Sequence, residues 1–252
     1  MRRRLLATAL AAVVALPAVP AAGASAAADP APRLSAPAAV LVESSTGRTL
    51  WARHADQERA IASTTKLMTV HVALQRFALR RVLTAPFYPT QAAESQIGLR
   101  AGERMTVADL VRAVMLPSAN DAANALAVRA GNGSKARFVA QMNREARQLG
   151  LRHTHYETPV GLDTPGNYST ASDLAKLARI DRRNAFLRGV MDRRRLTLRS
   201  GDHARTIVNR NTVVDEVPWA NGVKTGHTSL AGYVLVASGE QHGLTLLSAV
   251  LG

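Results

Sequence analysis

Three short polar segments, far apart in the chain, carry residue types suited to nucleophilic chemistry. They are Ser63-Thr64-Thr65-Lys66, Ser118-Ala119-Asn120 and Lys224-Thr225-Gly226. A deprotonated lysine can activate a serine without a histidine and aspartate pair, so the first segment offers a nucleophile and its base. The second adds another hydroxyl and an amide, and the third adds a cation beside a hydroxyl. Together they predict acyl transfer on a substrate that carries a carboxylate.

The spacing of Ser63 and Lys66 places both side chains on one face if a helix begins at Ser63. Lysine has an ordinary pKa of about 10.4, so it is protonated at neutral pH and is a poor base. Burial and a second cation lower that pKa, and Lys224 is the candidate for the second cation. Taken alone, the segment also fits a helix-capping serine followed by a solvated lysine.

The other two segments have ordinary readings as well as catalytic ones. Ser118 and Asn120 follow Pro117 in an expected tight loop, where Ser118 could relay a proton and Asn120 could orient the lysine and hold a substrate amide. The alternative is a turn with a helix cap at Asn120. Lys224 lies on an expected strand, where Gly226 would allow another backbone to approach closely. The alternative there is an edge strand, in which lysine is common.

Strand patterns occupy both ends of the chain. Residues 38–43 and 49–53 predict a hairpin around Ser45-Thr46-Gly47. Residues 223–228, 232–238 and 244–251 are β-type runs, with residues 239–243 linking the last two as a hairpin.

Helix patterns fill the middle. One buried helix is expected from Ser63 to about Arg80, and others at 106–116, 120–130, 134–150 and 170–179. The capping box is the signal at Thr106 with Asp109 and at Thr170 with Asp173. We therefore predict an α+β fold, with one antiparallel sheet of about five strands built from both chain ends and a helical lobe, residues 67–210, inserted in it.

This order of segments resembles the serine D-alanyl-D-alanine carboxypeptidases, the low-molecular-mass penicillin-binding proteins, which share a β-lactamase/transpeptidase-like fold. The resemblance covers residues 38–252. Its segments are residues 62–69, 116–123, 161–163, 168–170, 173–175, 222–228 and 231–233. Two departures are Ala119, where relatives often have Gly or Asp, and the end of the chain at Gly252. Relatives continue there into a helix that packs on the sheet, so we expect that helix to be missing from a truncated chain.

The resemblance implies a role for each matching residue. Ser63 would be the acylated nucleophile, Lys66 its general base, and Ser118 and Asn120 the proton shuttle and substrate-positioning pair. Lys224 and Thr225 would hold the terminal carboxylate, and the backbone N–H groups of Ser63 and His227 would form the oxyanion hole. The substrate-binding strand is Lys224, Thr225, Gly226, His227 and Thr228.

The implied activity is removal of the terminal D-alanine from peptidoglycan stem peptides through an acyl-enzyme, with β-lactams as inhibitors. A D,D-endopeptidase of the same family is a close alternative. A serine β-lactamase needs a fast deacylating base, and no E-x-x-L-N string follows Ser118, since Glu145 is out of register. A non-enzymatic wall-binding protein on this fold is the third alternative.

The first residues predict export. Residues 1–28 have a charged start, an apolar run from Leu5 to Val19 and small residues suited to cleavage, which is typical of a signal peptide. An uncleaved membrane anchor is the alternative. Residues 29–37 form a proline-rich leader, and residues 38–252 are the expected catalytic domain. The protein is then periplasmic or extracellular and associated with the cell wall.

The chain has a formal net charge of +14, which favours anionic partners. In an exported protein these are anionic envelope polymers or a membrane surface. A nucleic-acid partner is not predicted, because aromatic content is 4% and the sequence contains no recognisable nucleic-acid-binding motif. The sequence has no cysteine, and His153 and His155 lack a carboxylate at ligand spacing, so we predict no metal and no cofactor. Many arginines gather in one stretch: Arg179, Arg182, Arg183, Arg188, Arg193, Arg194, Arg195 and Arg199.

Overall fold

The computed structural model describes residues 32–252 apart from residues 90 and 92. The predicted signal peptide at residues 1–28 and the start of the leader therefore lie outside the described residues. Within the part that is described, none of the helices combines the length and the apolar composition needed to cross a bilayer.

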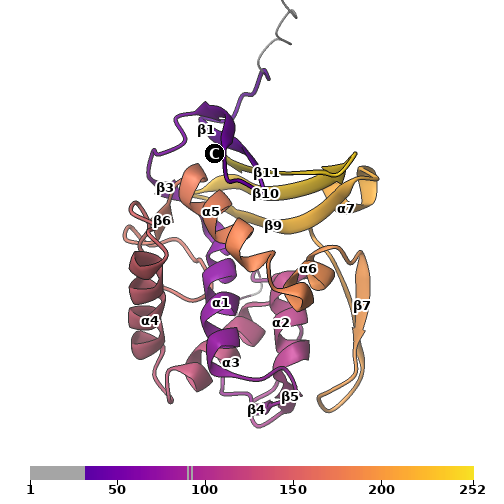
Figure 1. Cartoon of the computed structure of the whole chain (residues 1–252). Coiled ribbons are helices and arrows are strands. Elements are labelled where there is room, and N and C mark those ends of the chain that lie inside the picture. Colours follow the sequence, from indigo (N-terminus) through magenta and orange to yellow (C-terminus); the bar gives the residue numbers. More distant parts are fainter. Residues whose placement is uncertain (1–31, 90, 92) are drawn as a thin grey trace, which may run out of the picture. The chain divides into compact units, whose positions relative to one another are not determined.

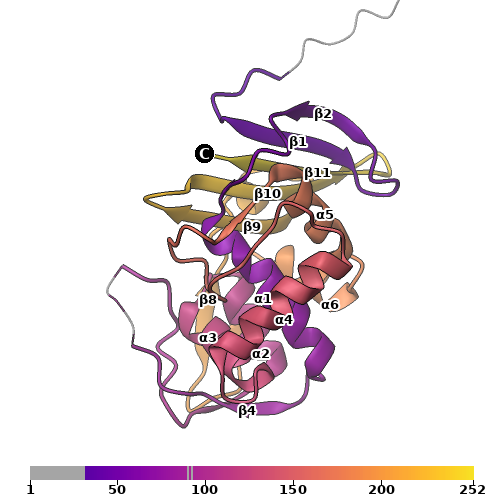
Figure 2. The same cartoon turned by 90° about the vertical axis from the view of Figure 1, so that its left-hand side faces the viewer.

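The first and last segments of the fold pair in one antiparallel sheet (Figures 1 and 2). Its order is β2-β1-β11-β10-β9, formed by β1 (Ala38–Glu43), β2 (Thr49–Arg53), β9 (Ala220–Thr228), β10 (Gly232–Gln241) and β11 (Leu244–Leu251). Val40 and Val236 both pair with Ala249, and all three side chains are buried. The predicted α+β class and the five-stranded sheet are confirmed.

The link between β10 and β11 is shorter than predicted. Both strands extend into the expected linker, leaving a two-residue turn of His242 and Gly243. Both turn residues have positive φ, 51° and 76°. Turns with two positive φ angles match the right-handed twist of antiparallel strands, which explains why the ladder continues so far.

The helix predicted from Ser63 to Arg80 is wrong at both ends. Ser63 lies in a 3₁₀ turn, η1 (Ala62–Thr65), and the α-helix that follows, α1, covers Lys66–Arg76. Phe77 is extended, with φ −132° and ψ 135°, and packs partly buried against the core. The α-helix therefore ends at Arg76, four residues before the predicted end.

The other predicted helices are confirmed within two residues: α2 (Val107–Met115), α3 (Asn120–Ala130), α4 (Lys135–Gln148) and α5 (Ala171–Asp181). Thr106 and Thr170 each accept the N–H three residues later, as expected. The acidic halves of the capping boxes have other partners. Asp109 accepts from the backbone N–H and the hydroxyl of Ser200, and Asp173 accepts from the backbone of His153.

Short elements between these helices carried no clear sequence pattern. They are β3 (Arg59–Ala60), β4 (Val82–Thr84), β5 (Arg104–Thr106), β6 (Tyr168–Ser169), α6 (Ala185–Met191), β7 (Arg195–Leu198), β8 (Arg205–Val208) and α7 (Val213–Glu216). A buried ion pair anchors the β7–β8 hairpin: Arg205 donates to both carboxylate oxygens of Glu103, at 2.7 and 2.9 Å. Such long-range pairing is invisible in a local pattern.

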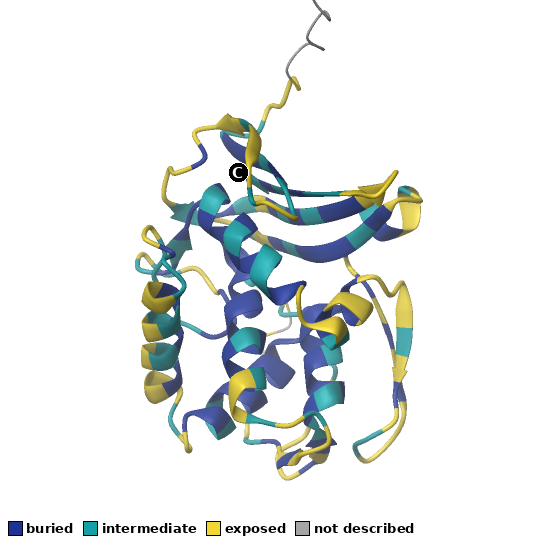
Figure 3. Cartoon of the chain, in the orientation of Figure 1, coloured by how far each residue is buried: buried dark blue, intermediate teal, exposed yellow. Residues whose placement is uncertain are grey.

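The catalytic segments are positioned by α1, which lies at the centre of the helical lobe. Its side chains Leu67, Met68 and Val70 are fully buried, and the ribbon of α1 is mostly dark blue in Figure 3. It contacts α2, α3, α4 and α5, and α5 packs against β11 and β1 on the helical face of the sheet. The start of α1 is therefore held between the helices and the sheet.

His71 of α1 joins three helices through a partly buried polar network. Its Nδ1 lies 2.6 Å from Asp181 of α5, and its Nε2 lies 3.1 Å from Glu145 of α4. Burial on its own lowers the pKa of His71, but the hydrogen bonds and charges of Asp181 and Glu145 outweigh it and raise the pKa above its ordinary value. The imidazolium is therefore favoured in the folded state.

We expect this network to make stability depend on pH. Because the folded-state pKa of His71 is raised, its stabilisation is complete below about pH 6.5 and is lost as pH rises through the folded-state value. His71→Asn should lower the free energy of unfolding by about 1.5–3 kcal/mol at pH 6 and by less at pH 9. Urea unfolding of both proteins at both pH values measures this, and equal losses would contradict it.

Candidate active site

The nucleophile turn begins with Ala62, whose φ of 45° is unusual for a residue other than glycine. The turn directs Ser63 toward Lys66, and Nζ of Lys66 lies 2.7 Å from Oγ of Ser63. The same Nζ donates to the carbonyl of Val160 at 2.6 Å. Gly161 follows directly, and a Cβ there would lie 2.0 Å from the Ala62 carbonyl oxygen, so only glycine allows the loop to pack against the turn.

Lys66 is fully buried, and this burial is the main cause that lowers its pKa well below the ordinary value. The positive charge of Lys224 lowers it further. Burial and the neighbouring cation therefore favour the neutral amine of Lys66 over its ammonium form. In the neutral form, one N–H would donate to the carbonyl of Val160, and the nitrogen lone pair could accept the proton of Ser63. The predicted closeness of the Lys66 amine to the Ser63 hydroxyl is present in the geometry.

The second segment meets the third. Ser118 has a φ of 65° and lies between α2 and α3, where Ala119 donates to the carbonyl of Ala113. Oγ of Ser118 lies 2.9 Å from Nζ of Lys224. The same Nζ also donates to the carbonyl of Thr225. Burial, and after it the charge of Arg210, lower the pKa of Lys224 to about 7. This hydroxyl and ammonium therefore form a buried pair beside the first one.

Gly226 brings the strand against the nucleophile turn. A Cβ at this position would lie 2.9 Å from the Ser63 nitrogen and 3.2 Å from the Ile61 carbonyl oxygen. The close backbone approach expected from this glycine is confirmed. All three polar segments therefore meet at the start of α1, with the edge strand β9 along one side.

The remaining predicted residues have contacts of their own. The amide of Asn120 donates to Glu94 at 2.8 Å, and its backbone N–H donates to Ser95. The exposed ring of His227 packs against the ring of Tyr233 at a tilt of 39°, with 4.4 Å between ring centroids. Thr228 accepts the N–H of Ala231 in the turn to β10. Asn120 and His227 lie beside the site, whereas the hydroxyl of Thr228 stabilises a turn.

Sequence reasoning missed several residues that complete the site. Glu94 holds Asn120 and accepts from Tyr88 at 2.5 Å, and burial is the main cause that raises the pKa of Tyr88. The backbone N–H of Arg210 donates to the carbonyl of Leu116, two residues before Ser118. The positive charge of Arg210 lowers the pKa of both buried lysines, Lys66 and Lys224. Glu94 sits in a long loop and Arg210 follows an arginine-rich stretch, so neither carried a positional signal.

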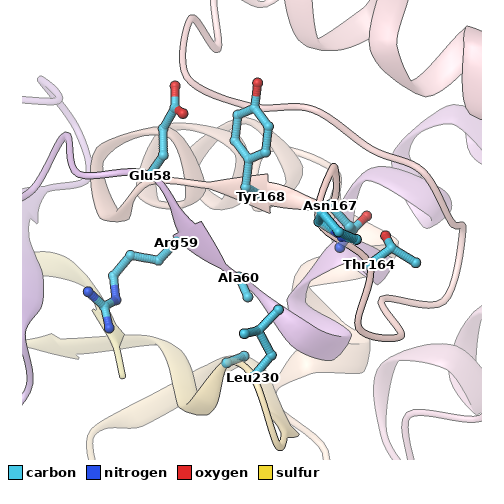
Figure 4. A pocket seen from close by; sticks show the side chains of 9 residues that line it. Glu58, Arg59, Ala60, Thr164, Asn167, Tyr168 and Leu230 are labelled. Atoms are coloured by element: carbon cyan, nitrogen blue, oxygen red, sulfur yellow. The ribbon is translucent and has the colours of Figure 1, made fainter.

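A pocket of about 480 Å³ lies next to the nucleophile turn (Figure 4). Ala60 of β3 and Leu230 of the β9–β10 turn both line it and are neighbours in Figure 4. Asn167 also lines it and donates to Thr65 inside η1. Asp163 accepts the N–H of Leu230 at 3.0 Å. These bonds hold the 160–167 loop against both the nucleophile turn and β9.

The serine, its buried amine and the second hydroxyl–amine pair are the arrangement expected from the resemblance to penicillin-binding proteins. Residues 24–252 match the peptidase S11 family, described as D-alanyl-D-alanine carboxypeptidase. The chain belongs to this family. The resemblance inferred from the polar segments is thereby confirmed.

Individual members of the family agree with this assignment. The chain is 32% identical to D-alanyl-D-alanine carboxypeptidase DacF of Bacillus subtilis over 86% of the chain, and it spans 57% of that relative's length. It is 36% identical to DacD of Salmonella typhimurium over 100% of the chain, and spans 66% of that relative. It is 34% identical to the D-alanyl-D-alanine carboxypeptidase of Streptomyces sp. strain K15, covering 87% of the chain and 81% of the relative. The chain thus spans less than two thirds of the first two relatives.

A solved structure shows the same fold. The crystal structure titled Streptomyces K15 DD-transpeptidase superimposes with a TM-score of 0.83 at 34% identity. The match covers 88% of this chain and 91% of that one. The predicted transpeptidase-like fold of this S11 family member is therefore confirmed.

Proposed function

We propose that this chain is a serine D,D-carboxypeptidase that removes the terminal D-alanine from peptidoglycan stem peptides and binds penicillin. Residues 38–252 would be its catalytic domain. The observation that carries the proposal is the fully buried Nζ of Lys66 at 2.7 Å from Oγ of Ser63. Export to the cell wall, through the predicted signal peptide, belongs to the same proposal.

In the acylation step, the neutral amine of Lys66 takes the proton of Ser63. The serine oxygen attacks the carbonyl carbon of the penultimate D-alanine, and its C–N bond to the terminal D-alanine breaks. Backbone N–H groups of Ser63 and His227 would stabilise the oxyanion, and each such donor contributes about 3–4 kcal/mol. The approach of β9 to η1 at Gly226 supports this pairing of donors.

The second pair of residues acts on the leaving group. Ser118, 2.9 Å from Lys224, would give its proton to the departing amine and take in exchange the proton that Lys66 removed from Ser63, so that the Lys66 amine and the Ser118 hydroxyl are both restored. Lys224 and Thr225 would hold the terminal carboxylate of the substrate, which places the scissile bond over Ser63. Asn120, fixed by Glu94, would contact the substrate amide. Water then attacks the acyl-enzyme, the serine regains its proton, and the shortened peptide leaves.

Acyl transfer to an amine is a second candidate, favoured by one observation. The superimposed Streptomyces K15 protein is titled a DD-transpeptidase. Release of D-alanine accompanied by a new peptide bond would identify a transpeptidase, whereas release with a free shortened peptide identifies a carboxypeptidase. Endopeptidase activity would cut a cross-linked peptide dimer, and an acyl-enzyme lifetime of milliseconds with penicillin would identify a β-lactamase.

The proposal is tested with the whole chain in two assays. A fluorescent penicillin should form a stable adduct, and mass spectrometry should locate that adduct on Ser63. A peptide ending in D-alanyl-D-alanine should lose its last residue, whereas the same peptide ending in L-alanine should not. Binding to cell-wall material without an adduct and without D-alanine release would replace the proposal with a wall-binding role.

Arg210 is expected to set the working pH range. The carboxylate is held only while Lys224 is charged, so kcat/KM should fall as pH rises through the pKa of Lys224, about 7 in the free protein. Arg210 lowers that pKa through its positive charge. Arg210→Gln should therefore move the alkaline limb of the profile to higher pH.

The charge-conserving variant Arg210→Lys is the matched control, and its alkaline limb should stay near that of the unmodified protein. The measurement is kcat/KM for D-alanine release between pH 5 and 10. If the limb in Arg210→Gln stays in place or moves to lower pH, Arg210 does not tune Lys224.

A further inference from the structure

Four arginines surround a cleft of about 500 Å³ that no step of the proposed reaction uses. Arg179 lies in the last turn of α5, Arg182 and Arg183 follow at its end, and Arg188 lies on α6. The facing wall is built from the β1–β2 turn and the β10–β11 hairpin. We call these four residues and this cavity the arginine cleft. In Figure 1, α5 and α6 lie below the sheet.

The charge of the arginine cleft is poorly compensated. Glu240 is the single carboxylate among its lining residues. Across residues 32–252, leaving aside 90 and 92, none of the four guanidinium groups has a salt bridge to a carboxylate. Like charges this close repel one another. The burial of Arg182, and next the charge of Arg188, lower the pKa of Arg182 more than the charges of Asp192 and Glu240 raise it.

Three of the four arginines are nevertheless held in place. Arg182 is only 6% exposed and donates to the carbonyl of Asn221 at 2.8 Å. Arg188 donates to the carbonyl of Arg182 at 3.1 Å, at the helix end where cations are favoured. The guanidinium of Arg179 lies against Gly47, where a Cβ would meet it at 3.0 Å. Three guanidinium groups fixed around a positively charged cavity form a preorganised anion site.

We propose that the arginine cleft binds phosphate groups of a linear polyanion. The planar guanidinium donates two parallel hydrogen bonds to phosphate, and several such groups converge here. A polymer is favoured over a flat lipid surface because Arg182 lies recessed in a cleft, which a flexible chain can enter. It is favoured over a lone phosphate because three further exposed arginines follow α6 in the chain: Arg193 before β7, Arg195 at its start and Arg199 directly after it.

The test uses long-chain sodium polyphosphate as the probe. Its affinity is measured by calorimetry for the unmodified chain and for Arg179→Gln/Arg183→Gln, which leaves the bonds of Arg182 and Arg188 intact. The matched control is Arg76→Gln/Arg80→Gln, which removes the same charge from exposed residues at and beyond the C-terminal end of α1. We expect at least about tenfold weaker binding for the cleft variant and less than about threefold for the control.

Each outcome bears on the proposal. Equal losses in both variants, or no binding by the unmodified chain, would overturn it and leave only general surface charge. Vesicles of phosphatidylglycerol and phosphatidylcholine form a second arm. Loss of vesicle binding in the cleft variant, with polyphosphate binding unchanged, would replace the polymer with a membrane. The cleft variant should still form the penicillin adduct, which shows that it is folded and separates this proposal from the proposed activity.

Discussion

Lys66→Met is expected to slow acylation of Ser63 by penicillin by about 10³-fold, the typical contribution of a general base. The amine is fully buried and lies 2.7 Å from the serine oxygen, and no other amine is hydrogen-bonded to that oxygen among the described residues. Methionine has a similar length and no proton acceptor of comparable strength. The serine then keeps its proton, and the attack on the carbonyl becomes slow.

The same substitution should leave the protein folded. A buried lysine is costly to a fold, and methionine fills its space with apolar atoms, while the carbonyl of Val160 loses a donor. These effects oppose each other, so we expect the free energy of unfolding to change by no more than about 1–2 kcal/mol.

Stopped-flow labelling measures the acylation rate. Lys135→Met is the matched control because Lys135 is exposed on α4, and its acylation rate should stay within about twofold of the original, as expected for a surface substitution. Ser63→Ala gives the baseline without a nucleophile. If Lys66→Met acylates at nearly the original rate, another group is the base and the proposed mechanism is wrong.

Gly226→Ala is expected to reduce acylation by about 10²–10³-fold. The added Cβ would lie 2.9 Å from the backbone nitrogen of Ser63 and 3.0 Å from Cβ of Ala62. Real Cβ atoms do not tolerate such a contact with backbone, so β9 or the nucleophile turn must move. Either shift separates the two N–H groups proposed to hold the oxyanion.

A second glycine provides the control for Gly226→Ala. Gly189 lies on α6, and a Cβ there would have no neighbouring atom within 4 Å. Gly189→Ala should keep the original acylation rate and raise stability by about 0.5–1 kcal/mol, since alanine favours helix over glycine. A Gly226→Ala protein that binds penicillin with a normal acylation rate would show that this approach of β9 to η1 is not needed.

The capping residues and alternating strand patterns were readable in the sequence because they act over a few residues. Thr106, Ser134 and Thr170 each cap a helix by a bond to the third residue on, so their positions predicted where helices begin. The end of α1 could not be predicted from the sequence. The backbone at Phe77 is extended, and its side chain packs against the core, which is a tertiary contact. Local helix propensity contains no information about contacts with residues that are distant in the sequence.

The sequence by itself determined the chemistry on offer: a serine with a lysine one turn later, a second hydroxyl, and a lysine on a glycine-containing strand. It also determined the sheet built from both chain ends, since apolar alternation marks strands wherever they lie. Only the tertiary structure decided that Lys66 is buried near the charge of Lys224. It also decided that the charge of Arg210 acts on the pKa of Lys224 and that Glu94 accepts a hydrogen bond from Asn120. The physical reason is that a pKa depends on burial and on charges brought together by folding, and neither is a property of sequence spacing.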